Sequence, residues 1–188
     1  MIQENPVEAA INRLSGYFGD LLAANPPATD ASIAHLEQIG GGLPREFAIF
    51  LSTCDGLRIG REGRDVELHM WGTHEILSAI LSPSGPDVPR EFLPIRGDPT
   101  GARDWLVFDE EPIGGVILRW DPWLPSTDLV GSSFGAYLGS WVGYLLRTLT
   151  PDGRVRTTTR PRPIFDARFC EDHDVHLSTL RQDARTAA

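Results

Sequence analysis

The chain has no lysine, and only two of its 188 residues are cysteines. These two, Cys54 and Cys170, are too few for a disulfide framework. Because 26 acidic residues stand against 17 arginines, the chain also lacks the cationic surface that phosphate contacts with nucleic acid require. We therefore expect neither a disulfide-stabilised fold nor a nucleic-acid partner.

Signals for export or membrane insertion are missing as well. The first ten residues, MIQENPVEAA, show no basic stretch followed by an apolar run. The longest uncharged run, residues 129–146, approaches the length of a membrane span, but glycines and serines interrupt it. These absences predict a cytoplasmic protein with no membrane partner.

The residues that are present suit one globular domain with a sizeable core. The apolar fraction is 41% and the charged fraction 23%, both ordinary for such a domain. We assign the domain to residues 1–150 and treat residues 151–188 as a C-terminal extension, either packed in part on the domain or separate from it. The net charge of −9 permits attraction to a cationic partner and equally fits a surface that only maintains solubility.

Apolar residues recur at helical spacing in five stretches, which predict helices over residues 6–22, 29–39, 44–54, 73–81 and 134–149. Pro44 is expected as the first residue of the third helix, where a missing N–H is tolerated. Three glycines, 40–42, end the second helix, and Asp55-Gly56 ends the third. The other expected N-terminal caps are Asn5, then Thr29 or Asp30, then Thr73, then Ser132 with Ser133.

Runs of β-branched and aromatic residues predict strands over residues 66–70, 92–96, 105–108 and 115–120. Residues 58–65, which are charged and glycine-rich, predict a loop or a hairpin. Strands that follow one another through short turns favour an antiparallel meander, here preceded and followed by helices. The sequence therefore predicts an α+β fold with a mostly antiparallel central sheet flanked by helices.

A family resemblance rests on four groups of residues in a fixed order. The first group is the pattern Ile33, Leu36-Glu37, Leu43-Pro44, Phe47, Phe50-Leu51 and Asp55-Gly56. The others are Leu93-Pro94-Ile95 with Gly97-Asp98, then Val116 to Trp120-Asp121, and finally Ser133-Phe134 with Tyr137-Leu138. Together they resemble the SUKH superfamily over residues 29–149. Asp55 stands where asparagine is commoner in that family, and three glycines stand where one is usual.

The SUKH superfamily joins cell-wall regulators of the Smi/Knr type with many bacterial immunity proteins. The resemblance therefore implies an α+β domain that binds protein and is not an enzyme. The function that the resemblance implies first is that of an immunity protein, which neutralises a cognate polymorphic toxin by direct binding. A regulatory scaffold is the alternative from the other branch. A small hydrolase using Asp98, Asp104 and Asp109 ranks third.

Negative charge is concentrated between residues 98 and 128, where three tryptophans are interleaved with it. Aromatic anchors among charged residues are typical of protein interfaces, in which charge also steers association. We expect Trp105 and Trp120 in the core and Trp123, between two prolines, at the surface. The pattern suits a basic, nuclease-like toxin. The candidate partner-binding residues are Asp98, Asp104, Asp109, Glu110, Glu111, Asp121, Trp123 and Asp128.

No catalytic, cofactor or metal site is predicted. Cys170, His173 and His176 are spaced three apart and could ligate a metal on one helical turn, but no fourth ligand is visible. Cys54 falls on the apolar face of its helix and is expected to be a small buried hydrophobe. Glycines 135, 139 and 143 give the last predicted helix a smooth stripe. We expect this stripe to pack tightly on the sheet rather than to form a homodimer seam, which favours a monomer.

Overall fold

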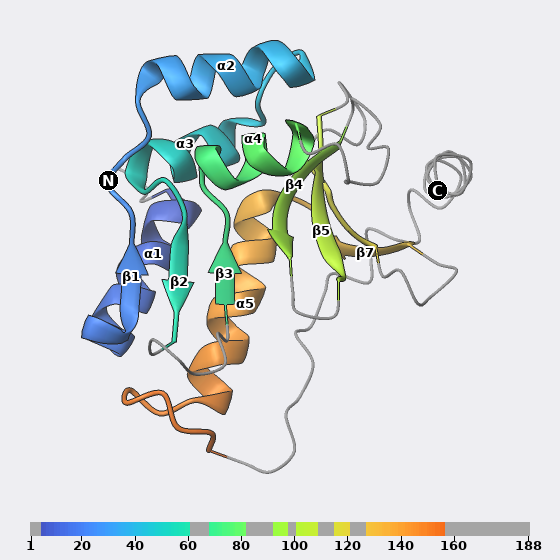
Figure 1. Cartoon of the computed structure of the whole chain (residues 1–188). Helices are drawn as coiled ribbons and strands as arrows, with labels where there is room; N and C mark the ends of the chain where they lie inside the picture. The colour runs from blue at the N-terminus through green and yellow to red at the C-terminus, as the bar shows by residue number, and fades with distance from the viewer. Residues whose placement is uncertain are drawn as a thin grey trace.

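The structure is a computed structural model that describes residues 5–60, 68–81, 92–97, 101–108, 115–120 and 127–156. Helices and strands both occur in these ranges, which confirms the α+β prediction (Figure 1). The helices are α1 (Pro6–Phe18), α2 (Asp30–Gly40), α3 (Arg45–Thr53), α4 (Thr73–Leu81) and α5 (Phe134–Thr148), with a 3-10 turn, η1 (Gly19–Leu21), after α1. The strands are β1 (Leu22–Ala24), β2 (Leu57–Ile59), β3 (Leu68–Met70), β4 (Phe92–Gly97), β5 (Arg103–Val107), β6 (Ile117–Trp120) and β7 (Thr127–Gly131).

The strands form two antiparallel sheets rather than one. The first has the order β1-β2-β3 and the second the order β4-β5-β6-β7. The N–H of Trp71, just after β3, donates to the carbonyl of Ile95 on β4 over 2.9 Å, so the two sheets adjoin at these strands. The strands therefore succeed one another in chain order across both sheets (Figure 1). The expected meander corresponds to the second sheet.

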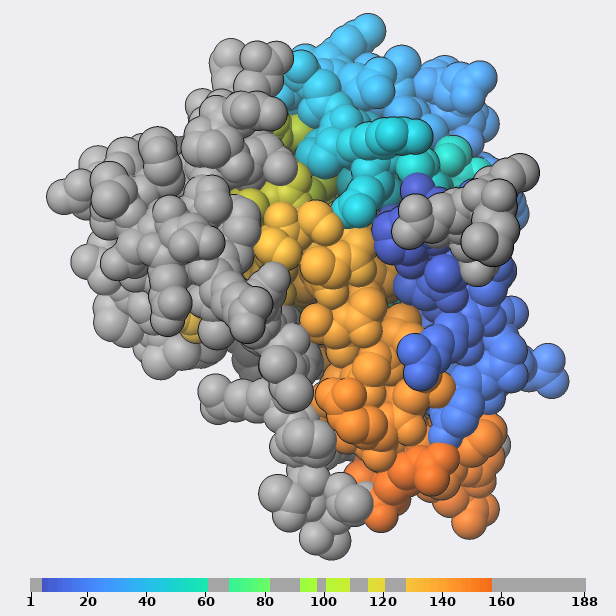
Figure 2. All heavy atoms as spheres, turned by 180° about the vertical axis from the view of Figure 1, so that it is seen from behind, coloured from blue at the N-terminus to red at the C-terminus, as the bar shows by residue number. Residues whose placement is uncertain are grey.

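Helices α1 and α5 lie side by side behind the three-stranded sheet, and α3 lies above them (Figure 2). The ring of Phe134, the first residue of α5, lies 4.9 Å from that of Phe47 and 5.1 Å from that of Phe50, both on α3. All three side chains are buried. A smaller core on the four-stranded sheet contains Trp105, with Trp120 packed against it in part. The prediction of a core position is confirmed for Trp105 and in part for Trp120, which is only half-buried.

Most predicted helix ends are confirmed by their caps. The side chains of Asn5, Thr29 and Ser133 accept N–H groups in the first turns of α1, α2 and α5. Gly41 ends α2 with a φ of 81°, a left-handed conformation that glycine adopts without strain. Pro44 differs from the prediction by one position, because it precedes the first helical residue of α3.

Residues 58 and 59, in the stretch predicted as a loop or a hairpin, belong to β2, which pairs antiparallel with β3 as the two strands of a hairpin do. Two predictions about local structure are wrong. Helix α1 ends at Phe18, because Gly19 turns the chain with a φ of 51°, and residues 22–24 form β1 instead of a last helical turn. The glycine stripe of α5 does not pack on the sheet: a Cβ at Gly135 would meet the Glu46 carboxylate of α3, and Gly139 has no neighbour within 4 Å of such an atom.

The chain stays attached to the domain for six described residues after residue 150, although all six are exposed. Residues 149 and 155 pair across a turn that follows α5. The Arg156 Nε donates to the carbonyl of Leu149 over 2.7 Å, and the Tyr17 hydroxyl of α1 donates to the same oxygen over 3.0 Å. Residues 157–188, with Cys170, His173 and His176, lie outside the described residues.

None of the helices described here combines the length and the apolar character needed to cross a membrane. Within the same ranges, no cluster of three or more histidine, cysteine, aspartate or glutamate residues is arranged to hold a metal ion.

The thiol of Cys54 is expected to be unreactive in the folded protein. It follows α3 with 2% of its surface exposed, and burial, with the neighbouring Asp55 carboxylate, raises its pKa to about 12. Because the thiolate is the reactive form, the native Cys170→Ser variant should not react with a thiol reagent at pH 8, and should react once unfolded in guanidinium. Rapid labelling of the native variant would contradict this packing of Cys54.

Candidate functional site

The structure describes two of the eight predicted partner-binding residues, which stand in one row on either side of Arg119 but differ in exposure. Asp128 is exposed on β7, at the edge of the four-stranded sheet. Asp104 lies on β5 with 1% of its surface exposed, so its prediction as a partner-binding surface residue is wrong. The remaining six lie outside the described residues: Asp98, Asp109, Glu110, Glu111, Asp121 and Trp123.

The register of the four-stranded sheet shows from which end of the sheet the segments with these six residues begin. Gly97, Arg103, Trp120 and Thr127 pair in one row across β4 to β7. Residues 98 and 121 therefore follow directly from the same end of the sheet. Residues 109–114 connect at the opposite end, where the N–H groups of residues 107 and 115 exchange bonds with the carbonyls of residues 116 and 107. The predicted acidic stretch thus attaches to both ends of the sheet, not to one.

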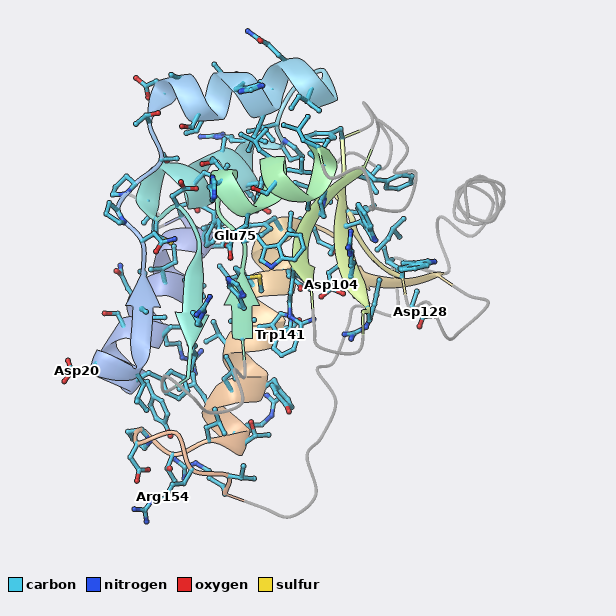
Figure 3. The ribbon with its side chains drawn as sticks, viewed as in Figure 1. Asp20, Glu75, Asp104, Asp128, Trp141 and Arg154 are labelled. Atoms are coloured by element: carbon cyan, nitrogen blue, oxygen red, sulfur yellow. The ribbon has the colours of Figure 1, made fainter. Side chains whose placement is uncertain are left out.

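Asp104 is the centre of a buried ionic cluster between the four-stranded sheet and α5. Its Oδ2 accepts a hydrogen bond from the Tyr137 hydroxyl over 2.5 Å and one from the Arg96 Nη1 over 3.0 Å. The Arg119 Nη1 lies 3.9 Å from the Oδ1. The Arg96 guanidinium in turn lies 4.5 Å from the centre of the Trp141 ring, and Figure 3 shows Asp104 and Trp141 near each other between the sheet and α5.

The chemistry of this cluster is structural. Burial and the negative charge of Asp104 raise the pKa of Tyr137 well above its usual value, so this hydroxyl stays protonated and remains a donor. One carboxylate thereby joins side chains of β4, β5, β6 and α5. The sequence did carry a signal for it, since Asp104 directly precedes residues 105–108, a predicted strand that is apolar on both faces.

Replacing Asp104 with asparagine is expected to destabilise the fold by roughly 3–5 kcal/mol, because the Arg96 charge would remain buried without its partner. Tyr137→Phe should cost about 1–3 kcal/mol through the loss of one buried hydrogen bond. The matched control is Asp128→Asn on the exposed edge strand, expected to change stability by no more than about 0.5 kcal/mol. Urea unfolding measures all three. Equal effects of the two aspartate substitutions would contradict the buried cluster.

A second polar site is a cleft of about 300 Å³ between the three-stranded sheet and the start of α4. The pairing register places Ala23, Arg58 and His69 in one row across β1, β2 and β3. Because residues paired across a sheet share a face, this row is the polar wall of the cleft. Figure 3 shows Glu75 where α4 begins, above β3. The residues around the cleft are Ala23, Asn25, Asp55, Leu57, Arg58, His69, Met70, Gly72, His74 and Glu75.

Asp55 fixes the start of α4 at one side of the cleft. Its two carboxylate oxygens accept the backbone N–H of Thr73 over 2.6 Å and the hydroxyl of the same residue over 2.8 Å. A Cβ on Gly72 would lie 2.2 Å from the Asp55 carbonyl oxygen, so the two backbones touch. Thr73 is therefore the first residue of α4 and not its cap. An asparagine at position 55 has only one acceptor oxygen for these two donors.

His69 and Glu75 join the sheet to α4 across the cleft. The His69 Nε2 lies 2.8 Å from the Glu75 Oε1, and the other oxygen of Glu75 accepts the Gly72 N–H over 3.2 Å. Burial lowers the pKa of His69 from its ordinary value of 6.5, an effect that Glu75 opposes and Arg58 reinforces. The imidazole is therefore neutral at pH 7. A neutral imidazole that bonds a carboxylate through Nε2 carries its proton there, which leaves Nδ1 as an acceptor.

Sequence reasoning missed the cleft because its walls come from three separate segments of the chain. The signal in hindsight is the alternation of Leu68, His69 and Met70, which turns the imidazole to the face opposite the two buried side chains. The cleft presents charged donors and carboxylate acceptors on rigid elements, an arrangement suited to recognising a small polar group.

Comparison with known proteins finds no family model that matches this chain and no curated protein that is similar to it.

Stability is expected to fall as the pH is lowered through about 6.5, because the unfolded chain then takes up a proton that folded His69 resists. The loss of stability due to His69 should be complete at pH values below the lowered pKa of this residue in the folded state. His69→Gln should remove this part of the pH dependence, and His35→Gln, at an exposed position on α2, should retain it. Urea unfolding between pH 5 and pH 8 measures the slope. An unchanged slope in His69→Gln would contradict the assigned shift.

Proposed function

We propose that this chain is a SUKH-type domain that acts by binding protein rather than by catalysis, as an immunity protein in the cytoplasm that neutralises a cognate toxin. The observation that carries the proposal is the charge of the connections between the strands of the four-stranded sheet. Residues 98–100, 109–114 and 121–126 hold five acidic residues and no basic one, together with Trp123.

The distribution of charge supports this. The described residues contain 10 acidic and 9 basic side chains, although the whole chain contains 26 and 17. The helices and strands are thus nearly neutral, and the acidic excess belongs to other ranges. A concentrated negative charge raises the association rate with a basic partner more than an evenly spread one would.

The residues that carry the family resemblance also have definite structural roles. Gly41 ends α2, Asp55 positions α4, and Ser133 caps α5. Tyr137 holds the buried carboxylate of Asp104. Side chains in such roles define a fold and leave the partner to be recognised elsewhere, which supports placing recognition in the acidic connections.

The hydrolase alternative loses one of its three carboxylates. Asp104 is buried and hydrogen-bonded to Tyr137 and Arg96, so it cannot reach a substrate at the surface. A regulatory scaffold would use the same acidic surface, and the two binding functions differ in the number and affinity of their partners.

The proposal is tested with the protein encoded by the adjacent gene, which for an immunity protein is the toxin. We expect a one-to-one complex whose association rate falls as salt rises, because its encounter is steered by charge. The variant Glu110→Gln/Glu111→Gln/Asp128→Asn should associate about tenfold more slowly at low salt.

The control removes the same number of charges at exposed positions elsewhere, as Asp20→Asn/Asp30→Asn/Glu37→Gln. Asp20 and Asp128 lie on opposite sides of the molecule (Figure 3). Equal slowing by both triple variants would refute steering by the acidic connections. Capture of several endogenous proteins at modest affinity, without the neighbouring one, would overturn the immunity function in favour of the scaffold.

A further inference from the structure

We propose that the cleft between β1–β3 and α4 binds a small zwitterion of the size of a free amino acid, with its carboxylate on Arg58 and its ammonium on Glu75. This site is independent of the acidic connections and of the partner proposed for them. The inference starts from the opposite charges of Arg58 and Glu75, which both line the cleft.

Arg58 is the cationic end of the cleft. It is exposed on β2, and within the described part of the chain it makes no ion pair with Asp55 or Glu75. On the same row of the sheet it stands between Ala23 and His69, so its neighbour on β1 contributes only a methyl group. A guanidinium fork matches the two oxygens of a carboxylate, which it can bind through two parallel hydrogen bonds.

Glu75 is the anionic end. Its side chain keeps 36% of its surface exposed while it bonds His69 and the Gly72 N–H. An ionised carboxylate offers about four acceptor positions, so roughly two remain for a ligand. Asp55, by contrast, directs both oxygens at Thr73 and is the structural carboxylate of the pair.

His69 pairs with Arg58 in the row across β2 and β3 and bonds Glu75 directly, so it lies next to both ends. The positive charge of Arg58 also contributes to the lowered pKa of His69. Arg58 and Glu75 thus line one cleft without forming an ion pair with each other, and its volume of about 300 Å³ is at the small end of ligand sites. One molecule that carries both charges satisfies both ends.

The test uses the whole chain with a panel of free amino acids at millimolar concentration and constant pH, followed by NMR of the backbone amides. We expect saturable shifts at residues 58, 69 and 72. For the amino acid that binds best, the N-acetyl derivative lacks the ammonium and the amide derivative lacks the carboxylate. Each should bind about tenfold more weakly or worse, since each loses one charge-assisted contact.

The matched variants are Arg58→Gln in the cleft and Arg13→Gln on the exposed face of α1. The first should lose binding about tenfold, and the second should bind as the unaltered chain does. The Glu75→Gln variant also alters the contact with His69. Its amino-acid binding is therefore interpreted only if its amide spectrum shows the native fold. The proposal is overturned if no amino acid gives saturable shifts, if the N-acetyl derivative binds equally well, or if the two arginine variants bind alike.

Discussion

The buried carboxylate of Asp104 is the interaction on which the arrangement of the domain depends. Removing an ionised group from water is costly unless donors replace the lost solvation. Here the replacement comes from Tyr137 and Arg96, with Arg119 nearby, so three strands and one helix must meet in a single geometry before the charge is tolerated. An apolar contact would permit small slips between sheet and helix. A carboxylate with directed donors does not, and it fixes the sheet on α5.

The same helix extends this constraint to the other half of the domain. Glu46 of α3 accepts the Gly135 N–H over 2.7 Å, so the first turn of α5 is held by α3 as well as by its own Ser133. Helix α3 ends at Thr53, and Asp55, two residues further on, positions α4 through Thr73. A chain of polar contacts therefore links the interior of the four-stranded sheet, through two helices, to the cleft on the three-stranded sheet. Both polar sites rest on rigid elements that constrain each other.

Local signals predicted most of the helices, and distant contacts explain what they missed. Asn5, Thr29 and Ser133 cap helices through donors two or three residues away, so the sequence reveals them. Strands β1 and β2 have three residues each, too few for an alternating pattern, and form because residues 22–24 find partners at 57–59. The depth of Asp104 was missed for a related reason. The charged Arg103 precedes it in the sequence, whereas its donors Arg96 and Tyr137 come from other elements. The cleft, built from three segments, is likewise visible only in the fold.

The turn after α5 has a mechanical consequence. Tyr17 and Arg156 both donate to the carbonyl of Leu149, so the chain leaves the described fold beside α1, at the end remote from Asp128 (Figure 3). A pulling force applied through a tether beyond Arg156 would act first on the two hydrogen bonds that Tyr17 and Arg156 donate to Leu149. It would act next on the contact between α1 and α5. The four-stranded sheet would carry load only after those helices separate. Immobilisation through the C-terminal side thus leaves the edge strand β7, with the exposed Asp128, outside the path of the force.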